Sequence, residues 1–453
     1  MENPIDRNQP NALGQMLSLR SIVYSGLAFW AVIILLNFIV TWLSEMVGFK
    51  APLTWPISVF DIPLIDSTRI VSLIIAAAVF AVLVLSVRRI LTSIPAVIIT
   101  GILLILVGNM IHGSESGLTR PITGYGAEYF EDAMQIVDPM YFLTAFNTLQ
   151  PFLHMHSQTH PPGAVLLIYG LYRLLESPWM ISVAILILST ALTVPFFHGV
   201  LRKMLPEGNT SERFSVFLLL LIPAVQVYFC ASVDAIVAAA FLGVLYFFLQ
   251  KNSVCSFIGT VVFLLIASFL SFAAVFLIPV MIGYDWIRSR NASRSLGVIL
   301  ACAAIWLVVN LTLGYNWLES LSTAARIENP QGFRLLSEPP DYLFSRLECI
   351  LEIIVFFGPL LLVLFLRGMK LKDYDRLKAL TILGIATLPA MFLTGAYKTG
   401  ETARTCLFIY PFLMLPVAAM FHKTPPNNQE MILISAWISA QILLMQFLGF
   451  YLW

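Results

Sequence analysis

Acidic and histidine residues gather in one stretch of this sequence, between residues 112 and 163. The acidic residues come first, and three of the six histidines follow within seven residues. They are Glu128, Glu131, Asp132, His154, His156 and His160. Carboxylates can act as general bases, and histidines can move protons or donate hydrogen bonds to an anion. The stretch therefore predicts a site of acid–base or group-transfer chemistry.

Simpler explanations exist for each part of this stretch. The acidic residues could form the solvated face of an amphipathic helix at a membrane surface. The histidine spacing of i, i+2 and i+6 matches no common zinc pattern, so the sequence predicts no metal and no other cofactor, although a divalent ion stays an alternative. Pro161 and Pro162 could simply end one segment of regular structure and start the next helix.

A second group of reactive residues lies between Lys398 and Thr405. Here Lys398 and Arg404 bring an ammonium and a guanidinium close to the start of an apolar helix. Arginine beside a helix N-terminus suits phosphate or pyrophosphate. The alternative is an interfacial anchor in which Glu401 pairs with Arg404 along one helical turn.

Single carboxylates within apolar segments form a third group of candidates. Asp234 lies at the start of one such segment, and an isolated carboxylate in a membrane is a functional candidate. It could equally cap its helix. Glu348 and Glu352 are four residues apart, so they share one helix face. They could pair with Arg346 or line a cavity.

The elements that must position these residues follow from the composition. Of 453 residues, 59% are apolar and 11% are charged, against roughly 25% charged in a soluble domain. The net charge of +1 excludes a nucleic-acid-binding surface and a disordered acidic chain. The mean hydropathy of +0.87 indicates an integral membrane protein. The five cysteines are dispersed, so neither a disulfide framework nor a zinc site is predicted.

Hydropathy predicts an all-α bundle of about thirteen membrane spans and no signal peptide. A further apolar stretch, Ala164–Leu175, is too short to cross and is predicted as a re-entrant or interfacial helix. The predicted spans are 22–44, 70–87, 90–111, 179–200, 214–230, 232–250, 254–270, 271–287, 296–315, 349–366, 379–395, 405–421 and 431–451.

Charge asymmetry predicts the orientation of these spans. With residues 1–21 in the cytoplasm and the short stretch not crossing, 17 of the 26 Lys and Arg residues lie in inner segments. Cytoplasmic loops carry such an excess, so this arrangement is favoured and the C-terminus is predicted outside. Two long connections, 112–163 and 316–348, then lie outside, together with all the candidate site residues.

Four motifs occur in a fixed order along the chain. They are Ala127-Glu128-Tyr129-Phe130, His160-Pro161-Pro162-Gly163, Val233-Asp234-Ala235, and Arg404 leading to Tyr410-Pro411. In this order they resemble motifs of the polytopic GT-C superfamily glycosyltransferases, which include lipid A aminoarabinose transferases and protein O-mannosyltransferases. The resemblance covers residues 90–421. Two additional spans at 22–89 precede this module, and a final span lies within 422–453.

The resemblance implies a polyprenyl-phosphate-linked monosaccharide as donor and inversion at the anomeric carbon. It implies that Glu128 deprotonates the acceptor, with Asp132 or Glu131 as substitutes. Arg404 and Lys398 would neutralise the leaving phosphate with help from His160 or His156. Two positions depart from the family pattern, since Ala127 replaces its leading Asp and Ser271 aligns with a Lys.

The expected function is a multi-pass glycosyltransferase, with a bacterial inner membrane as the expected location. Its partners would be the lipid-linked donor, the bilayer and a glycan, lipid or protein acceptor, with no nucleic acid. The alternatives are a transporter or flippase for a lipid-linked or anionic solute, and a polysaccharide polymerase or ligase.

Overall fold

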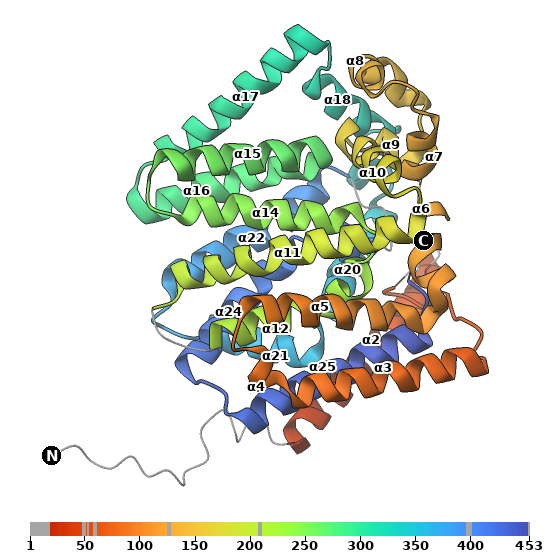
Figure 1. The fold of residues 1–453 in the computed structure, drawn as a ribbon, viewed down its shortest axis with the longest axis vertical. Helices are drawn as coiled ribbons and strands as arrows, with labels where there is room; N and C mark the ends of the chain where they lie inside the picture. The colour runs from red at the N-terminus through yellow and green to blue at the C-terminus, as the bar shows by residue number, and fades with distance from the viewer. Residues whose placement is uncertain are drawn as a thin grey trace, which may run out of the picture.

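The fold is a bundle of helices (Figure 1). The computed structural model describes residues 19–47, 51, 54–57, 61–124, 128–206, 211–395 and 401–451, with the backbone alone at 19–22 and 128. Within these ranges the regular structure is helical, and one isolated antiparallel bridge joins Asp61 to Phe450. The predicted all-α class is therefore confirmed.

Eight of the described helices are long and apolar enough to cross a membrane. They are Val23–Val47 within α2 (Leu19–Val47), α3 (Ser67–Leu85), α5 (Ile94–Asn109) with η1 (Met110–His112), α11 (Pro178–Met204), η4 (Phe272–Phe276) with α16 (Leu277–Ser289), α17 (Ser293–Leu313), α22 (Asp375–Leu393) and α25 (Asn428–Leu448). Their outer faces expose large apolar side chains such as Phe38, Ile74 and Leu311. Apolar surface of this extent needs lipid around it, so the protein is a multi-pass membrane protein.

A sharp bend separates two further apolar helices, α20 (Pro339–Phe357) and α21 (Pro359–Met369). Their axes differ by 98°, so they form a broken span or a re-entrant loop. Gly358 between them has φ of +94°, and a Cβ there would come within 2.7 Å of the Gln441 side chain. Glycine is the residue that reaches this backbone region without strain. With the pair counted as one span, the structure has up to nine candidate spans in its described part.

The remaining predicted spans fall on shorter helices. They are α12 (Ser211–Leu220), α13 (Pro223–Tyr228), α14 (Val233–Leu249), α15 (Val254–Leu270), α23 (Thr402–Thr405) and α24 (Ile409–Lys423). Helices α14 and α15 have 17 residues each, roughly 25 Å of helix against a hydrocarbon core of about 30 Å. Most of α14 is buried among other helices, which explains its apolar sequence without contact to lipid. The structure thus gives eight or nine candidate spans where hydropathy predicts thirteen.

The short predicted helix is present as α10 (Pro162–Leu175). It has 14 residues and is shorter than a span. Pro162 occupies its first turn, where the missing N–H costs no helical hydrogen bond. Helix α10 packs on α7, α11 and α15, which fixes the chain that precedes it.

The two long connections fold into short helices that meet at one end of the bundle (Figure 1). Asn147 and Asn316 exchange two hydrogen bonds of 2.8 Å, and Gln150 donates to the Ser320 carbonyl. The first connection contains η2 (Glu115–Thr119), α6 (Arg120–Thr123), α7 (Glu128–Gln135), α8 (Pro139–Leu149), η3 (Gln150–Phe152) and α9 (Met155–Gln158), and the second contains α18 (Trp317–Glu328) and α19 (Arg334–Ser337). We call this assembly the cap.

The last helix is fastened to the N-terminal helices at the cap end. Arg69 of α3 donates from Nε to the Phe447 carbonyl at 3.0 Å and from Nη2 to the Gln446 carbonyl at 2.7 Å. These are carbonyls of the last turn of α25, which lack partners within their helix. At the other end of α3, α4 (Val87–Ile90) leads to α5. Residues that follow α25 are thereby held against the cap.

Candidate functional site

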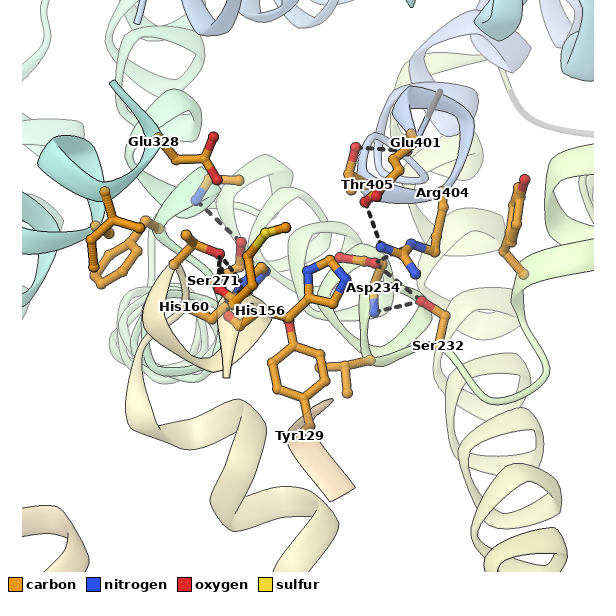
Figure 2. Close-up of a pocket in the computed structure, with 18 of the residues that line it drawn as sticks. Tyr129, His156, His160, Ser232, Asp234, Ser271, Glu328, Glu401, Arg404 and Thr405 are labelled. Carbon is orange, nitrogen blue, oxygen red and sulfur yellow. Dashed lines mark hydrogen bonds and ion pairs between the residues drawn. The ribbon is translucent and has the colours of Figure 1, made fainter. Parts of the chain in front are cut away.

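A pocket of about 740 Å³ lies under the cap. Helices α6, α7, α9, α10 and α18, the starts of α14 and η4, helix α23 and Tyr451 provide its walls. Most of the wall is apolar, with phenylalanines such as Phe130, Phe272 and Phe276. Its charged or titratable polar residues include Asp234, His156, His160, Glu328, Glu401 and Arg404 (Figure 2). A mainly apolar cavity of this size with a few convergent polar groups is typical of a small-molecule site.

Arg404 is the only cation among the lining residues in the described ranges. Its Nη2 donates to Glu401 Oε2 at 2.7 Å, and its Nε lies 3.6 Å from Asp234 Oδ2. Burial lowers the pKa of Arg404, but Glu401 and Asp234 outweigh that effect and raise it overall. The pocket therefore contains a permanently charged guanidinium that two carboxylates hold in place.

Asp234 owes its position to the start of α14. Ser232 is the N-cap of this helix, and its hydroxyl accepts from the Asp234 backbone N–H and donates to Asp234 Oδ2, both at 3.1 Å. The cap of this helix is therefore Ser232 and not Asp234, and the Asp234 carboxylate faces Arg404 in the pocket. The predicted pairing of Glu401 with Arg404 is present, and phosphate binding by Arg404 stays a prediction.

Glu352 lies behind the pocket wall and is fully buried. Its Oε2 accepts from the backbone N–H of Thr402 at 3.0 Å, and the N–H of Ala403 is a second donor. These two amides begin the turn that carries Arg404. Glu352 does not line the pocket. It holds in position the turn that carries Arg404.

A pair of substitutions at Glu352 tests this placement. Glu352→Gln keeps a side-chain oxygen as acceptor and is expected to leave the melting temperature close to that of the wild type. Glu352→Leu leaves the two amides without their acceptor, which costs about 1–3 kcal/mol in a buried position. Thermal unfolding of the detergent-solubilised protein measures both. Equal melting temperatures for the two variants would contradict the placement.

His156 and His160 face Asp234 and Arg404 across the pocket (Figure 2). Nδ1 of His160 lies 3.0 Å from the His156 carbonyl, and a carbonyl only accepts, so this nitrogen carries the proton. Burial lowers the pKa of His160, although Asp234 opposes the shift. Burial and the nearby Arg404 lower the pKa of His156 to about 3. Both imidazoles are therefore neutral at neutral pH.

These two neutral histidines predict a loss of stability in acid. The unfolded chain binds protons at its histidines below about pH 6.5, whereas folded His156 does so only near pH 3. The unfolded state therefore binds more protons in that window, and stability falls as pH falls below about 6.5. In a series of melting temperatures from pH 8 to pH 5, His156→Gln is expected to show a smaller decline than the wild type. Parallel declines in the two proteins would rule out His156 as a cause.

His154 belongs to a separate cluster outside the pocket lining. Its Nδ1 lies 2.8 Å from Asp132 Oδ1, and its Nε2 lies 2.9 Å from Glu131 Oε2. Asp132 also accepts from the His154 backbone N–H and is almost fully buried. The cluster ties α7 to α9, and these two helices supply Tyr129 and His156 to the pocket. Glu131 and Asp132 therefore support the wall without forming part of it.

Two predicted site residues cannot be placed by their side chains. Glu128 is the first residue of α7, directly before Tyr129, and the structure describes only its backbone. Lys398 lies outside the described residues. Their predicted roles stay predictions.

The pocket also contains residues that the sequence did not single out as site candidates. Tyr129 contacts the His160 ring edge-to-face, with 5.4 Å between ring centroids. Glu328 ends α18 and faces the histidines from the opposite wall (Figure 2). Tyr451 follows the last helix and is almost fully buried. Tyr129 forms part of a quoted motif, whereas no sequence pattern marks Glu328 or Tyr451.

A metal site does not emerge from the described side chains, since no three His, Cys, Asp or Glu residues among them converge on one point. No protein-family model matches the sequence, and no curated protein is significantly similar to it. The family resemblance therefore stays a prediction that functional experiments must test.

Proposed function

We propose that this protein is a membrane glycosyltransferase that moves a monosaccharide from a polyprenyl-phosphate donor to an acceptor, with inversion. The observation that carries the proposal is the pocket under the cap. It combines an apolar wall, one fixed guanidinium and a neutral histidine with an oriented proton. These features suit group transfer from a lipid-linked phosphate, because an apolar wall can hold the lipid and preorganised polar groups can stabilise the charge that develops.

Arg404 is proposed to bind the phosphate of the donor. A guanidinium has five N–H donors, so it can contact a phosphate while Glu401 and Asp234 hold it in place. Charge develops on the leaving phosphate as its bond to the sugar breaks, and Arg404 stabilises that charge. Lys398, six residues earlier in the sequence, is proposed as a second cation. Because His156 and His160 are neutral, they contribute no positive charge to the stabilisation of the leaving phosphate.

His160 is proposed to accept the proton of the acceptor hydroxyl. Its Nδ1–H is committed to the His156 carbonyl, so its Nε2 is the lone-pair nitrogen. The acceptor oxygen bonds to the anomeric carbon, the bond to the phosphate oxygen breaks, and the proton goes to Nε2. Asp234 then stabilises the imidazolium. Glu128, the base implied by the family resemblance, is the alternative, and the two assignments give different mutant phenotypes.

We further propose that the cap and its pocket face the outside of a bacterial inner membrane. The charge asymmetry of the sequence supports this orientation. In this arrangement the N-terminus is cytoplasmic, and the thirteen predicted crossings include the short helices in the interior of the bundle. The donor would enter from the outer leaflet.

A transporter or flippase stays the main alternative, and a polymerase or ligase is the other. A transporter requires access to its site from both faces. Below the pocket, Val280 and Met281 of α16 and Leu380 of α22 are fully buried, so these helices pack closely towards the other face. This packing separates the cap pocket from the opposite face of the bundle, which favours a transferase. A polymerase or ligase would use the same pocket with a longer glycan.

Purified protein in lipid nanodiscs tests the proposal. Polyprenyl-phosphate donors that carry radiolabelled mannose or glucose are supplied with a glycolipid extract as acceptor. The expected result is label in an acceptor product, or label released as free sugar where water replaces the acceptor. Uptake of a labelled donor head group into proteoliposomes without a covalent product would instead support the transporter.

A further inference from the structure

A second cavity, of about 470 Å³, lies at the opposite end of the bundle from the cap. Helix α16 and the 3₁₀ turn before it contribute Phe276 to the cap pocket and Arg288 to this cavity. Helix α22 also runs between the two cavities. Thr394, which follows this helix, lines the cap pocket, and Arg376 in its first turn lines the second cavity. Both helices are candidate spans, so the two cavities lie at opposite membrane faces. We call the second one the basal pocket.

The basal pocket is strongly cationic. Its positively charged residues are Lys203, Arg288, Lys372 and Arg376. Its two carboxylates, Asp373 and Asp375, already pair with Lys423 at 3.1 Å and Lys378 at 2.8 Å, and neither lysine lines the pocket. Within the described part of the chain, no ion pair or side-chain hydrogen bond joins the four lining cations to a partner. The four cations are exposed, and they outnumber the two carboxylates of the lining, so the pocket has a net positive charge.

Helix dipoles account for only part of this charge. Lys203 and Arg288 lie in the last turns of α11 and α16, where cations are favourable. Arg376 lies in the first turn of α22, the unfavourable end for a cation. Lys372 lies in the connection before that helix. An anion in the pocket would stabilise these two residues in a way that the fold itself does not.

The basal pocket lies at the level of the membrane where lipid head groups are found. Three of its cations flank the ends of candidate spans, which lie at the membrane–water boundary. Tyr284 contributes a hydroxyl from a nearly buried ring, and this hydroxyl lies 3.5 Å from Met204 Sδ. Basic pockets between transmembrane helices are known to bind the phosphates of anionic lipids.

We propose that the basal pocket binds a phosphate group, supplied by the head group of an anionic phospholipid in the adjacent leaflet or by free phosphate. The phosphate contacts Arg288 and Arg376 from opposite helices and links α16 to α22. Binding stabilises that end of the bundle and requires no sugar transfer. The proposal is therefore independent of the function proposed for the cap pocket.

Thermal unfolding of the full chain in detergent tests this proposal. The probes are dioleoylphosphatidylglycerol, zwitterionic dioleoylphosphatidylcholine and sodium phosphate. The test variant is Arg288→Gln/Arg376→Gln. The control is Arg88→Gln/Lys251→Gln, which removes two exposed cations that lie outside the pocket lining, after α3 and after α14.

Phosphatidylglycerol is expected to raise the melting temperature of the wild type and the control saturably, with apparent affinity about thirtyfold weaker in the test variant. Phosphatidylcholine is expected to have no such effect. Stabilisation by sodium phosphate that is likewise lost in the test variant would identify free phosphate as the source. The proposal is overturned if neither probe stabilises the wild type, or if test and control variants lose stabilisation equally.

Discussion

Arg404→Gln is expected to lower the rate of sugar transfer by about 10²–10³-fold, the cost of removing one preorganised charge-stabilising group. Arg404 is the only cation among the described lining residues, and Glu401 at 2.7 Å holds its guanidinium in place. Glutamine cannot neutralise the leaving phosphate. Arg404→Lys keeps the charge but loses the planar fork, so an intermediate rate is expected. Transfer of labelled sugar in nanodiscs measures all three proteins.

Controls for this prediction must separate chemistry from folding. Without Arg404, the Glu401 and Asp234 carboxylates lose their shared partner, which destabilises a partly buried site. Arg404→Gln/Glu401→Gln removes one unpaired charge and is expected to regain stability without regaining transfer. Arg326→Gln, on α18 beside the pocket but outside its lining, is expected to retain transfer. A wild-type rate in Arg404→Gln would show that Arg404 does not bind the donor phosphate.

The membrane class was predictable because composition alone determines it. A chain with 11% charged residues cannot cover the surface of a large soluble protein. The number of spans was less predictable. Hydropathy detects apolar helices, but other helices bury most of α14, and its 17 residues fall just below the candidate spans, the shortest of which has 18. The bend at Gly358 likewise has no hydropathy signal.

Individual site residues were predictable, but their assembly was not. Arg404, Asp234 and His160 were singled out because charged or titratable groups are rare in apolar segments. That they meet in one pocket depends on where the fold places α23, the start of α14 and the segment between α9 and α10, which sequence spacing does not encode. Asp132 is the opposite case. It is close in sequence to Tyr129, which lines the pocket, but it bonds to His154 outside the pocket lining.

The strongest test of the proposed proton transfer is His160→Asn. The amide nitrogen of asparagine can replace Nδ1 as donor to the His156 carbonyl, so the local turn keeps its hydrogen bond. Asparagine provides no counterpart to the Nε2 lone pair. General-base catalysis contributes roughly 10²–10⁴-fold, so turnover is expected to fall by this amount while donor binding is unchanged. Single-turnover transfer and binding of a labelled donor measure the two effects separately.

The pH profile and Glu128→Gln decide between the two proposed bases. Burial lowers the pKa of His160, so its Nε2 stays unprotonated below its usual range, and wild-type turnover is expected to stay level to below pH 6.5. If His160 is the base, His160→Asn loses turnover and Glu128→Gln retains most of it, because a carboxamide keeps the size and polarity of Glu128. The reverse pattern would assign the proton to Glu128. His160 would then act only through the hydrogen bond that asparagine preserves, and the neutral imidazole would be a positioning group for α9 and Tyr129.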